Sequence, residues 1–263
     1  MAKIYSSYDE EPDPVFEPLT DQEYCTFYDL EMGSYTEDGR YYDSILRRDG
    51  NFLDLGCGTG RLTTILNSQG RTIIGADNSL QMLKKATSVC PENLFVCMDM
   101  TMMTFQGFFD AIIIGYNTLN MLTTEKKVVQ CLSGCRDALK MDGTIHLQLY
   151  TPTPDFCLSN NKSFQFQLLR QPCGGLVIKE ILKQFTADHT VTIEERYRVR
   201  PTPNKGKNRE LKRIYRVTGF SGKRWQTLFS RCGFTVVNSF GDFNGTIYDP
   251  RNCGNFIAQL KRS

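Results

Sequence analysis

Three closely spaced glycines and the carboxylates that follow them are the residues best suited to chemistry in this chain. Gly56, Gly58 and Gly60 stand directly after an apolar run and open a predicted helix. Since glycine has no side chain, the backbone amides of such a loop can lie against a ligand. Asp77 ends the next apolar run, where a carboxylate can accept hydrogen bonds from both hydroxyls of a ribose. The glycines alone would fit a plain turn, but together with Asp77 they favour a nucleoside-binding site.

The distances between the glycines distinguish the nucleosides that such a site could bind. A dinucleotide-binding loop has the order G-x-G-x-x-G. Here the order is D-x-G-x-G-x-G, with Asp54 still on the preceding strand. This order resembles the first motif of the class I S-adenosylmethionine-dependent methyltransferases. Residues 75–83, 95–100, 109–117 and 139–144 resemble later motifs of that family in the same order, so the resemblance covers roughly residues 51–150.

The resemblance implies S-adenosyl-L-methionine as the cofactor, S-adenosyl-L-homocysteine as its product, and no metal. By position, Asp54 would lie near the methionine amino group, Asp77 would hold the ribose, and Asp99 with Met100 would hold the adenine. The residues implied in cofactor binding are Tyr28, Asp54, Gly56, Cys57, Gly58, Gly60, Asp77, Asn78, Met82, Asp99, Met100 and Tyr116.

A narrower resemblance concerns the tyrosine-rich stretch over residues 24–42 and a β-rich block late in the chain. Together they are similar to the small-molecule N-methyltransferases of the glycine/sarcosine and nucleotide-sugar amine types. On that match Tyr28 would lie near the methionine end of the cofactor and Tyr24 near the acceptor. Tyr116 and Asn117 would lie beside the reactive sulfonium, so the catalytic candidates are Tyr24, Tyr116 and Asn117.

Several of these residues have simpler structural interpretations. Asp99 could only cap a turn, Met100 could belong to the core, and the tyrosines could serve packing. Cys57 fits a place that needs a small side chain, and a reactive thiol at the helix start is the less favoured alternative.

One departure from the N-methyltransferases concerns the proton of the acceptor. Relatives often carry a histidine after the fourth strand, whereas this chain has Met121 there. Either a tyrosine or water removes the proton, or the acceptor is a softer nucleophile such as a thiol, or the substrate differs altogether.

The elements that must position these residues alternate between strand and helix. Apolar runs predict strands over 51–55, 72–76, 94–98, 110–115 and 144–150, and helical spacing predicts helices over 61–68, 79–88 and 125–140. A turn is predicted at 141–143, and one or two short helices are expected over 21–48. Nearly all-apolar strands that alternate with helices indicate an α/β fold, in which a parallel sheet is covered on both faces.

The pattern changes after Pro154. Residues 164–170, 176–185, 190–199 and 210–220 are strand-like, with no convincing helix between them; a helix over 223–232 and strands over 234–240 and 255–260 follow. We therefore expect a Rossmann-like seven-stranded sheet with an antiparallel β insertion after strand five. The expected divisions are an N-terminal arm with cap helices (1–48), a cofactor-binding domain (49–152 and 221–263), and an acceptor-binding lid (153–220).

Composition sets limits on location and partners. The 263 residues are 40% hydrophobic and 23% charged, with a net charge of +2. This near-neutral balance does not favour nucleic acid or a membrane surface. The ten cysteines contain no C-x-x-C, so reduced thiols in a cytoplasmic protein are expected. Residues 1–20 are expected to form a loose arm, and a monomer or homodimer is expected.

The leading hypothesis is a methyltransferase for a small-molecule acceptor, an amine above all. A basic run, Lys205, Lys207, Arg209, Lys212, Arg213 and Arg216, fits a solvated edge strand or a clamp for an anionic acceptor. The alternatives are an RNA or protein methyltransferase, a non-catalytic S-adenosylmethionine-binding protein and, less favoured, a metalloid methyltransferase that uses the cysteines.

Overall fold

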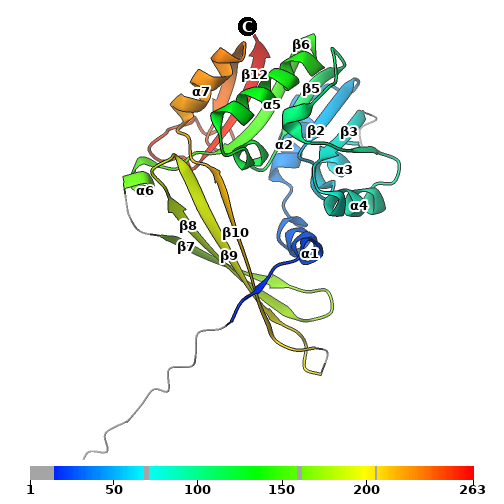
Figure 1. The fold of residues 1–263 in the computed structure, drawn as a ribbon. Helices are drawn as coiled ribbons and strands as arrows, with labels where there is room; N and C mark the ends of the chain where they lie inside the picture. Colours follow the sequence, from blue (N-terminus) through cyan, green and yellow to red (C-terminus); the bar gives the residue numbers. More distant parts are fainter. Residues whose placement is uncertain (1–14, 68–70, 159–161, 205) are drawn as a thin grey trace, which may run out of the picture.

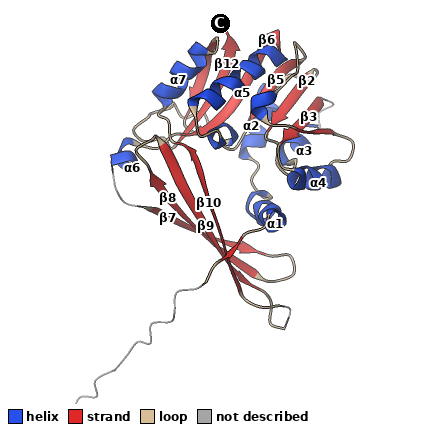
Figure 2. Cartoon of the chain, in the orientation of Figure 1, coloured by secondary structure: helices blue, strands red, loops and turns tan. Residues whose placement is uncertain are grey.

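The computed structural model describes residues 15–67, 71–158, 162–204 and 206–263. It contains two sheets (Figures 1 and 2). The larger sheet has the strand order β11-β12-β6-β5-β2-β3-β4, and the smaller has the order β1-β10-β9-β8-β7. Strands β2 to β6 pair in parallel, whereas β12 and β11 join β6 at its other edge in antiparallel pairing. The predicted α/β fold with a seven-stranded sheet and an antiparallel insertion is therefore confirmed.

The strands of the larger sheet are β2 (Asn51–Leu55), β3 (Thr72–Asp77), β4 (Leu94–Cys97), β5 (Phe109–Ile114), β6 (Leu139–Tyr150), β11 (Phe234–Phe240) and β12 (Asn255–Arg262). Helices α3 (Arg61–Asn67), α4 (Leu80–Val89), α5 (Glu125–Ala138) and α7 (Gly222–Arg231) connect them, with the short turns η1 (Met100–Met102) and η2 (Thr118–Met121). Ser79 caps α4, since its Oγ accepts from the Met82 amide at 3.3 Å.

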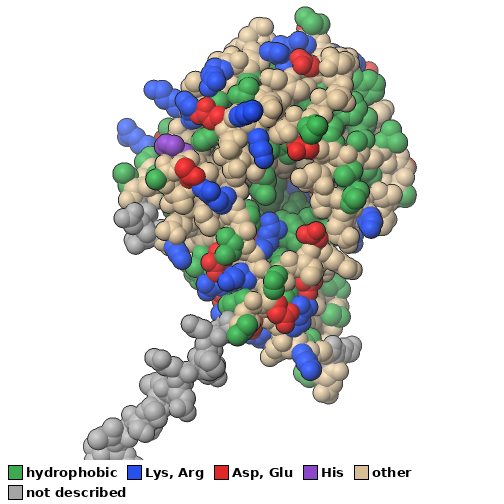
Figure 3. All heavy atoms as spheres, viewed as in Figure 1, with side chains coloured by type: hydrophobic (Ala, Val, Ile, Leu, Met, Phe, Trp, Pro, Cys, Tyr) green, Lys and Arg blue, Asp and Glu red, His purple; other side chains and the backbone are tan. Residues whose placement is uncertain are grey.

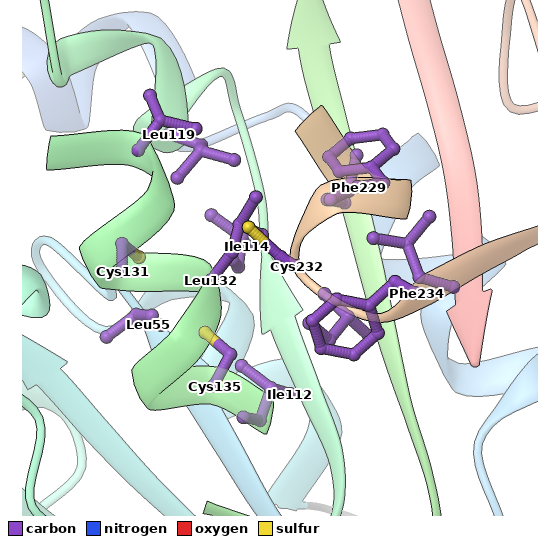
Figure 4. Packing of buried hydrophobic residues seen from close by; sticks show 14 of the residues in the cluster. Leu55, Ile112, Ile114, Leu119, Cys131, Leu132, Cys135, Phe229, Cys232 and Phe234 are labelled. Atoms are coloured by element: carbon purple, nitrogen blue, oxygen red, sulfur yellow. The ribbon is translucent and has the colours of Figure 1, made fainter. Parts of the chain in front are cut away.

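The two faces of this sheet are buried by different helices, because strand side chains alternate in direction. Leu53, Ile112 and Ile114 join the core under α5 and α7, whereas Phe52 and Ile113 join the core under α2 and α3. Figure 4 shows the first core, in which Leu132 of α5 and Phe229 of α7 pack over the sheet. The α5 thiols Cys131 and Cys135 are buried there too. All ten cysteines of the chain are free, as predicted.

The smaller sheet consists of β7 (Ser163–Arg170), β8 (Leu176–Phe185), β9 (Thr190–Arg200) and β10 (Arg209–Thr218), with the two-residue β1 (Glu17–Pro18) beside β10. It projects from the larger sheet, and α1 (Asp21–Met32) runs beside it (Figure 1). Phe27 of α1 stacks on Tyr197 of β9 with ring centroids 4.9 Å apart. Helix α2 (Glu37–Ile45) then leads to the glycine loop.

The two sheets are joined at Asn120, which is fully buried. Its Nδ2 donates to the carbonyls of Tyr150 (3.0 Å) and Thr218 (2.9 Å), and its Oδ1 accepts from the Tyr150 amide (3.0 Å). Tyr150 is the last residue of β6 and Thr218 the last of β10. The chain therefore leaves the larger sheet and returns to it at one place.

The structure corrects two local predictions. The turn predicted at 141–143 lies inside β6, and α5 ends at Ala138 instead of residue 140. Leu139 already pairs with Phe109, so the extra residues form a bulge before Thr144 pairs with Ala111. A short helix α6 (Pro154–Leu158) was not predicted. The predicted arm lies outside the described residues over 1–14, as do Ser68 and Lys205.

Candidate active site

A cavity of about 730 Å³ lies between the carboxyl ends of the parallel strands and the inner face of the smaller sheet. Figure 3 shows the molecule hollowed between these two parts. All but one of the predicted site residues line it, namely Tyr24, Tyr28, Asp54, Gly56, Cys57, Gly58, Asp77, Asn78, Met82, Asp99, Met100, Tyr116 and Asn117. Residues far apart in the sequence thus meet at the edge where open α/β sheets bind ligands.

The exception is Gly60, which packs against helix α4 and strand β4. A Cβ at Gly60 would lie 3.1 Å from the Cβ of Ala86 and 3.4 Å from the Phe95 ring, and its φ is +81°. The structure therefore does not bring Gly60 to the cavity wall.

The first part of the glycine loop needs glycine for two reasons. Gly56 and Gly58 both have left-handed backbones, with φ of +81° and +54°. A Cβ at Gly56 would also lie only 2.1 Å from Cγ2 of Thr118. The Gly58 amide donates to Asp77 Oδ2 at 2.9 Å, so the loop and the carboxylate at the end of β3 are held together.

Two further carboxylates, Asp54 and Asp99, border the cavity, and their pKa values are shifted in opposite directions. Asp54 is almost fully buried and accepts from Thr63 Oγ1 at 2.7 Å. Burial raises the pKa of Asp54 to about 6. Asp99 accepts from the amide and hydroxyl of Thr101, both at 2.8 Å, which lowers its pKa. Asp99 thus caps a turn, as its simpler interpretation held, and it also lines the cavity.

Backbone strain marks the end of β5. Tyr116 and Asn117 are non-glycine residues with left-handed backbones, with φ of +45° and +62°. Such conformations occur preferentially at functional sites. The Oδ1 of Asn117 is buried and has no hydrogen-bond partner within the described parts of the chain. A bound group with an N–H or O–H would satisfy it.

The tyrosines of α1 form an aromatic group with Tyr116. Tyr28 meets Tyr116 edge-on, with ring centroids 6.3 Å apart, and Tyr24 lies 6.2 Å from Tyr28. Burial raises the pKa of all three phenols. They are therefore neutral donors near pH 7, which disfavours a tyrosine as the general base.

Arg61, which opens α3, is a cavity residue that sequence reasoning missed. Its guanidinium pairs with Asp38 through two hydrogen bonds of 2.8 and 2.5 Å and donates to the Tyr35 carbonyl at 2.9 Å. The Nε of Arg61 is buried without a partner among the residues that the structure describes. Its position directly after the glycine loop was the available signal.

The opposite wall comes from the smaller sheet. Its cavity-facing residues include Lys179, Lys183, Glu195, Arg213 and Tyr215. Of these, only Arg213 was noted from the sequence, as part of the basic run. The signal in the sequence was that Lys179 and Lys183 fall in phase with the buried Val177 and Ile181.

Other predictions concern residues without a catalytic arrangement. His146 is buried in β6, where burial lowers its pKa to about 4, as expected for a core position. Burial also raises the pKa of the Cys57 thiol, with Asp54 and Asp77 adding to the effect. The reactive-thiol alternative for Cys57 is therefore disfavoured. Met121 lines the cavity and is half exposed.

Comparisons with known proteins find a methyltransferase-domain match and a shared fold. Residues 52–143 match a family described as "Methyltransferase domain". A Bacillus subtilis (strain 168) protein named "Putative methyltransferase YqeM" is 31% identical over 137 residues, 49% of this chain and 55% of its own. The match thus spans about half the length of that relative. A Geobacillus protein of the same description (strain WCH70) is 25% identical over 195 residues, 73% of this chain and 76% of its own.

Solved structures share the whole fold. An S-adenosylmethionine-dependent methyltransferase from Clostridium acetobutylicum superposes with a TM-score of 0.75 at 14% identity, covering 92% of this chain and 98% of that one. CalS10, an amino pentose methyltransferase from Micromonospora echinaspora solved with S-adenosylmethionine bound, gives 0.72 at 20% identity, covering 95% and 100%. The resemblance stated from the motifs is confirmed.

Proposed function

We propose that this chain, which carries a class I methyltransferase domain, transfers a methyl group from S-adenosylmethionine to a small-molecule acceptor, most simply an amine. The observation that carries the proposal is the two-walled cavity. One wall holds the glycine loop with Asp54 and Asp77, and the other holds polar side chains of the smaller sheet, here interpreted as the lid over the acceptor.

The residues present fit S-adenosylmethionine. Its carboxylate would satisfy the buried Nε of Arg61, and its ammonium would pair with Asp54. Asp77 would hold the ribose, and Asp99 with Asn78, Met82 and Met100 would surround the adenine. When bound, the cofactor supplies a methyl group on a positively charged sulfur.

The chain's own residues align the acceptor and exclude water. Tyr24, Tyr28 and Tyr116 close the space above the glycine loop. The Oδ1 of Asn117 is available to accept a hydrogen bond from an N–H group of the methyl acceptor. The lone pair of that nitrogen would then point away from Asn117. With neutral tyrosines and Met121 at the place of a histidine, we propose that water takes the proton of the acceptor.

The choice of an amine is supported by the solved structures. CalS10 is named an amino pentose methyltransferase, and KedS8, at a TM-score of 0.70, is named a sugar N-methyltransferase. An RNA or protein acceptor would predict salt-sensitive binding of a polymer.

None of the helices that the structure describes has both the length and the apolar character of a membrane span. A cytoplasmic location, a monomer or homodimer, and independence from metal and nucleic acid stay predictions.

Calorimetric titration with S-adenosylmethionine and S-adenosylhomocysteine tests the proposal. We expect both to bind with micromolar affinity. Transfer of labelled methyl to a panel of amines, thiols and RNA then assigns the acceptor class. Folded protein that binds neither nucleoside would contradict the proposal, and binding without transfer to any acceptor would favour a non-catalytic binding protein.

The affinity for S-adenosylmethionine should depend on pH through Asp54. Its pKa is about 6 in the free protein, so the carboxylate is largely protonated at pH 5 and ionised at pH 7. Because only the ionised form pairs with an ammonium, we expect affinity to fall about tenfold from pH 7 to pH 5. Binding at pH 6 should release protons, visible as a dependence of the calorimetric heat on the buffer. Asp54→Asn should bind weakly at both pH values and release none; equal release by this variant would exclude Asp54.

A further inference from the structure

The inner face of the smaller sheet arranges its charges in rows. Strand pairing places Ile181 of β8, Glu195 of β9 and Arg213 of β10 side by side. The next row toward the larger sheet contains Lys183, Ile193 and Tyr215. All six line the cavity. These two rows therefore present three charged side chains and two isoleucines to whatever occupies the space opposite the glycine loop.

Two carboxylates at this side of the cavity, Glu195 of β9 and Glu31 of α1, are already bound by a cation. Lys179 Nζ lies 2.6 Å from Glu31 Oε2 and 3.0 Å from Glu195 Oε1. Glu195 also receives the hydroxyl of Tyr215 at 3.3 Å and lies 3.5 Å from Arg213 Nε. These carboxylates are thus neutralised before any acceptor enters.

Arg213 is held in place as well. Its guanidinium lies 3.8 Å from the Tyr24 ring centroid and 4.3 Å from that of Tyr215. Arg209 and Arg216 are paired outside the cavity, Arg209 with Glu17 and Glu23 and Arg216 with Asp188. Within the described part of the run, only Arg213 lines the cavity, and β10 has an outer neighbour, β1, only at Leu211 and Lys212.

Lys183 differs from Arg61, Lys179 and Arg213, the other cavity cations that are at least partly buried. In the described ranges it has no ion pair and no hydrogen bond, and its one contact of this kind is with the Tyr150 ring, 5.2 Å from Nζ. Its side chain is half-buried, and burial together with nearby Lys179 lowers the pKa of Lys183. A cation removed from water without a counter-ion is destabilising, and an anion in the cavity would relieve this.

We propose that Lys183 binds an anionic group of the methyl acceptor, a carboxylate or a phosphate. The proposal rests on the proposed function, because it places the acceptor in this cavity. The acceptor would then carry its reactive nitrogen near Asn117 and its negative charge at Lys183, and the two isoleucines would cover the apolar part between them. Selection would favour anionic amines over their neutral analogues.

The test uses the protein saturated with S-adenosylhomocysteine, whose own binding is measured first. Inorganic phosphate and acetate are then titrated separately, with chloride keeping the ionic strength constant. We expect at least one of them to bind and to protect Lys183 from acylation, as read by mass spectrometry. Lys183→Met should weaken that binding about tenfold, while Lys183→Arg keeps it. Lys223→Met, at an exposed position on α7, is the matched control and should behave as the wild type.

The outcomes separate the two proposals. If S-adenosylhomocysteine does not bind, the proposed function fails. If it binds but neither anion does, or if Lys183→Met binds anions as the wild type does, the anion site is wrong.

A transfer assay with glucosamine and glucosamine 6-phosphate tests the same site, because these two acceptors differ only in the phosphate. Lys183→Met should raise the KM of the phosphorylated amine alone and leave kcat unchanged. A loss of kcat in Lys183→Arg, with anion binding intact, would instead make Lys183 the base and overturn the proposal.

Discussion

Asp77→Ala is expected to weaken the binding of S-adenosylmethionine and S-adenosylhomocysteine at least tenfold, about 1.4 kcal/mol. Hydrogen bonds to a charged acceptor are among the strong ones in proteins, and this carboxylate would receive two from the ribose. It also holds the Gly58 and Ser79 amides, each at 2.9 Å, so its removal loosens the loop itself. Calorimetry on the purified variant measures the loss directly.

Two controls separate ligand contact from loop disorder. Asp77→Asn keeps one carbonyl oxygen and nearly the same shape, so it should bind more tightly than Asp77→Ala and less tightly than the wild type. Asp49→Ala removes an exposed carboxylate near the start of β2 and should leave affinity unchanged. Wild-type affinity in Asp77→Ala would remove the ribose role from this residue.

Of the substitutions considered, Lys179→Met should lower the free energy of unfolding the most. Lys179, Glu195 and Glu31 have side-chain exposures of only 4%, 6% and 13%. Removing the lysine leaves Glu31 without its cation and Glu195 with Arg213 alone, and such a break costs about 3–5 kcal/mol. Urea unfolding of the variant against the wild type gives the difference. The exposed Lys223→Met should differ from the wild type by less than about 0.5 kcal/mol.

A second variant shows whether charge is the cause. The double variant Lys179→Met, Glu31→Gln keeps Glu195 paired with Arg213 and leaves no carboxylate of this cluster without a cation, so much of the lost stability should return. If the single variant unfolds within about 1 kcal/mol of the wild type, the cluster is not a significant source of stability.

The wall of the cavity formed by the glycine loop could be predicted because its information is local. Gly56 and Gly58 lie in the loop after β2 and Asp77 ends β3, and the ends of parallel strands meet at one edge of a sheet. Gly60 was assigned to the same wall because its spacing continues the loop. Only the approach of Ala86 and Phe95 shows that it serves packing.

The wall formed by the smaller sheet could not be predicted in the same way. Lys183 meets Tyr215 only through the pairing of three strands, and Lys179 meets Glu31 across 148 positions of the chain. Strand register depends on the whole buried face, not on any short pattern. The bulge at the start of β6 was missed for a similar reason, since its residues look like an ordinary turn.

The joint at Asn120 has a consequence for protein engineering. Because the chain departs at Tyr150 and returns at Thr218 to the same amide side chain, the intervening segment has its two ends together. Such a segment can be exchanged as one cassette while the glycine loop is left intact, provided that the seam formed by Phe27 and Tyr197 is redesigned with it. Under the proposed function, donors with another inner face would then change the range of acceptors while the glycine loop stays the same.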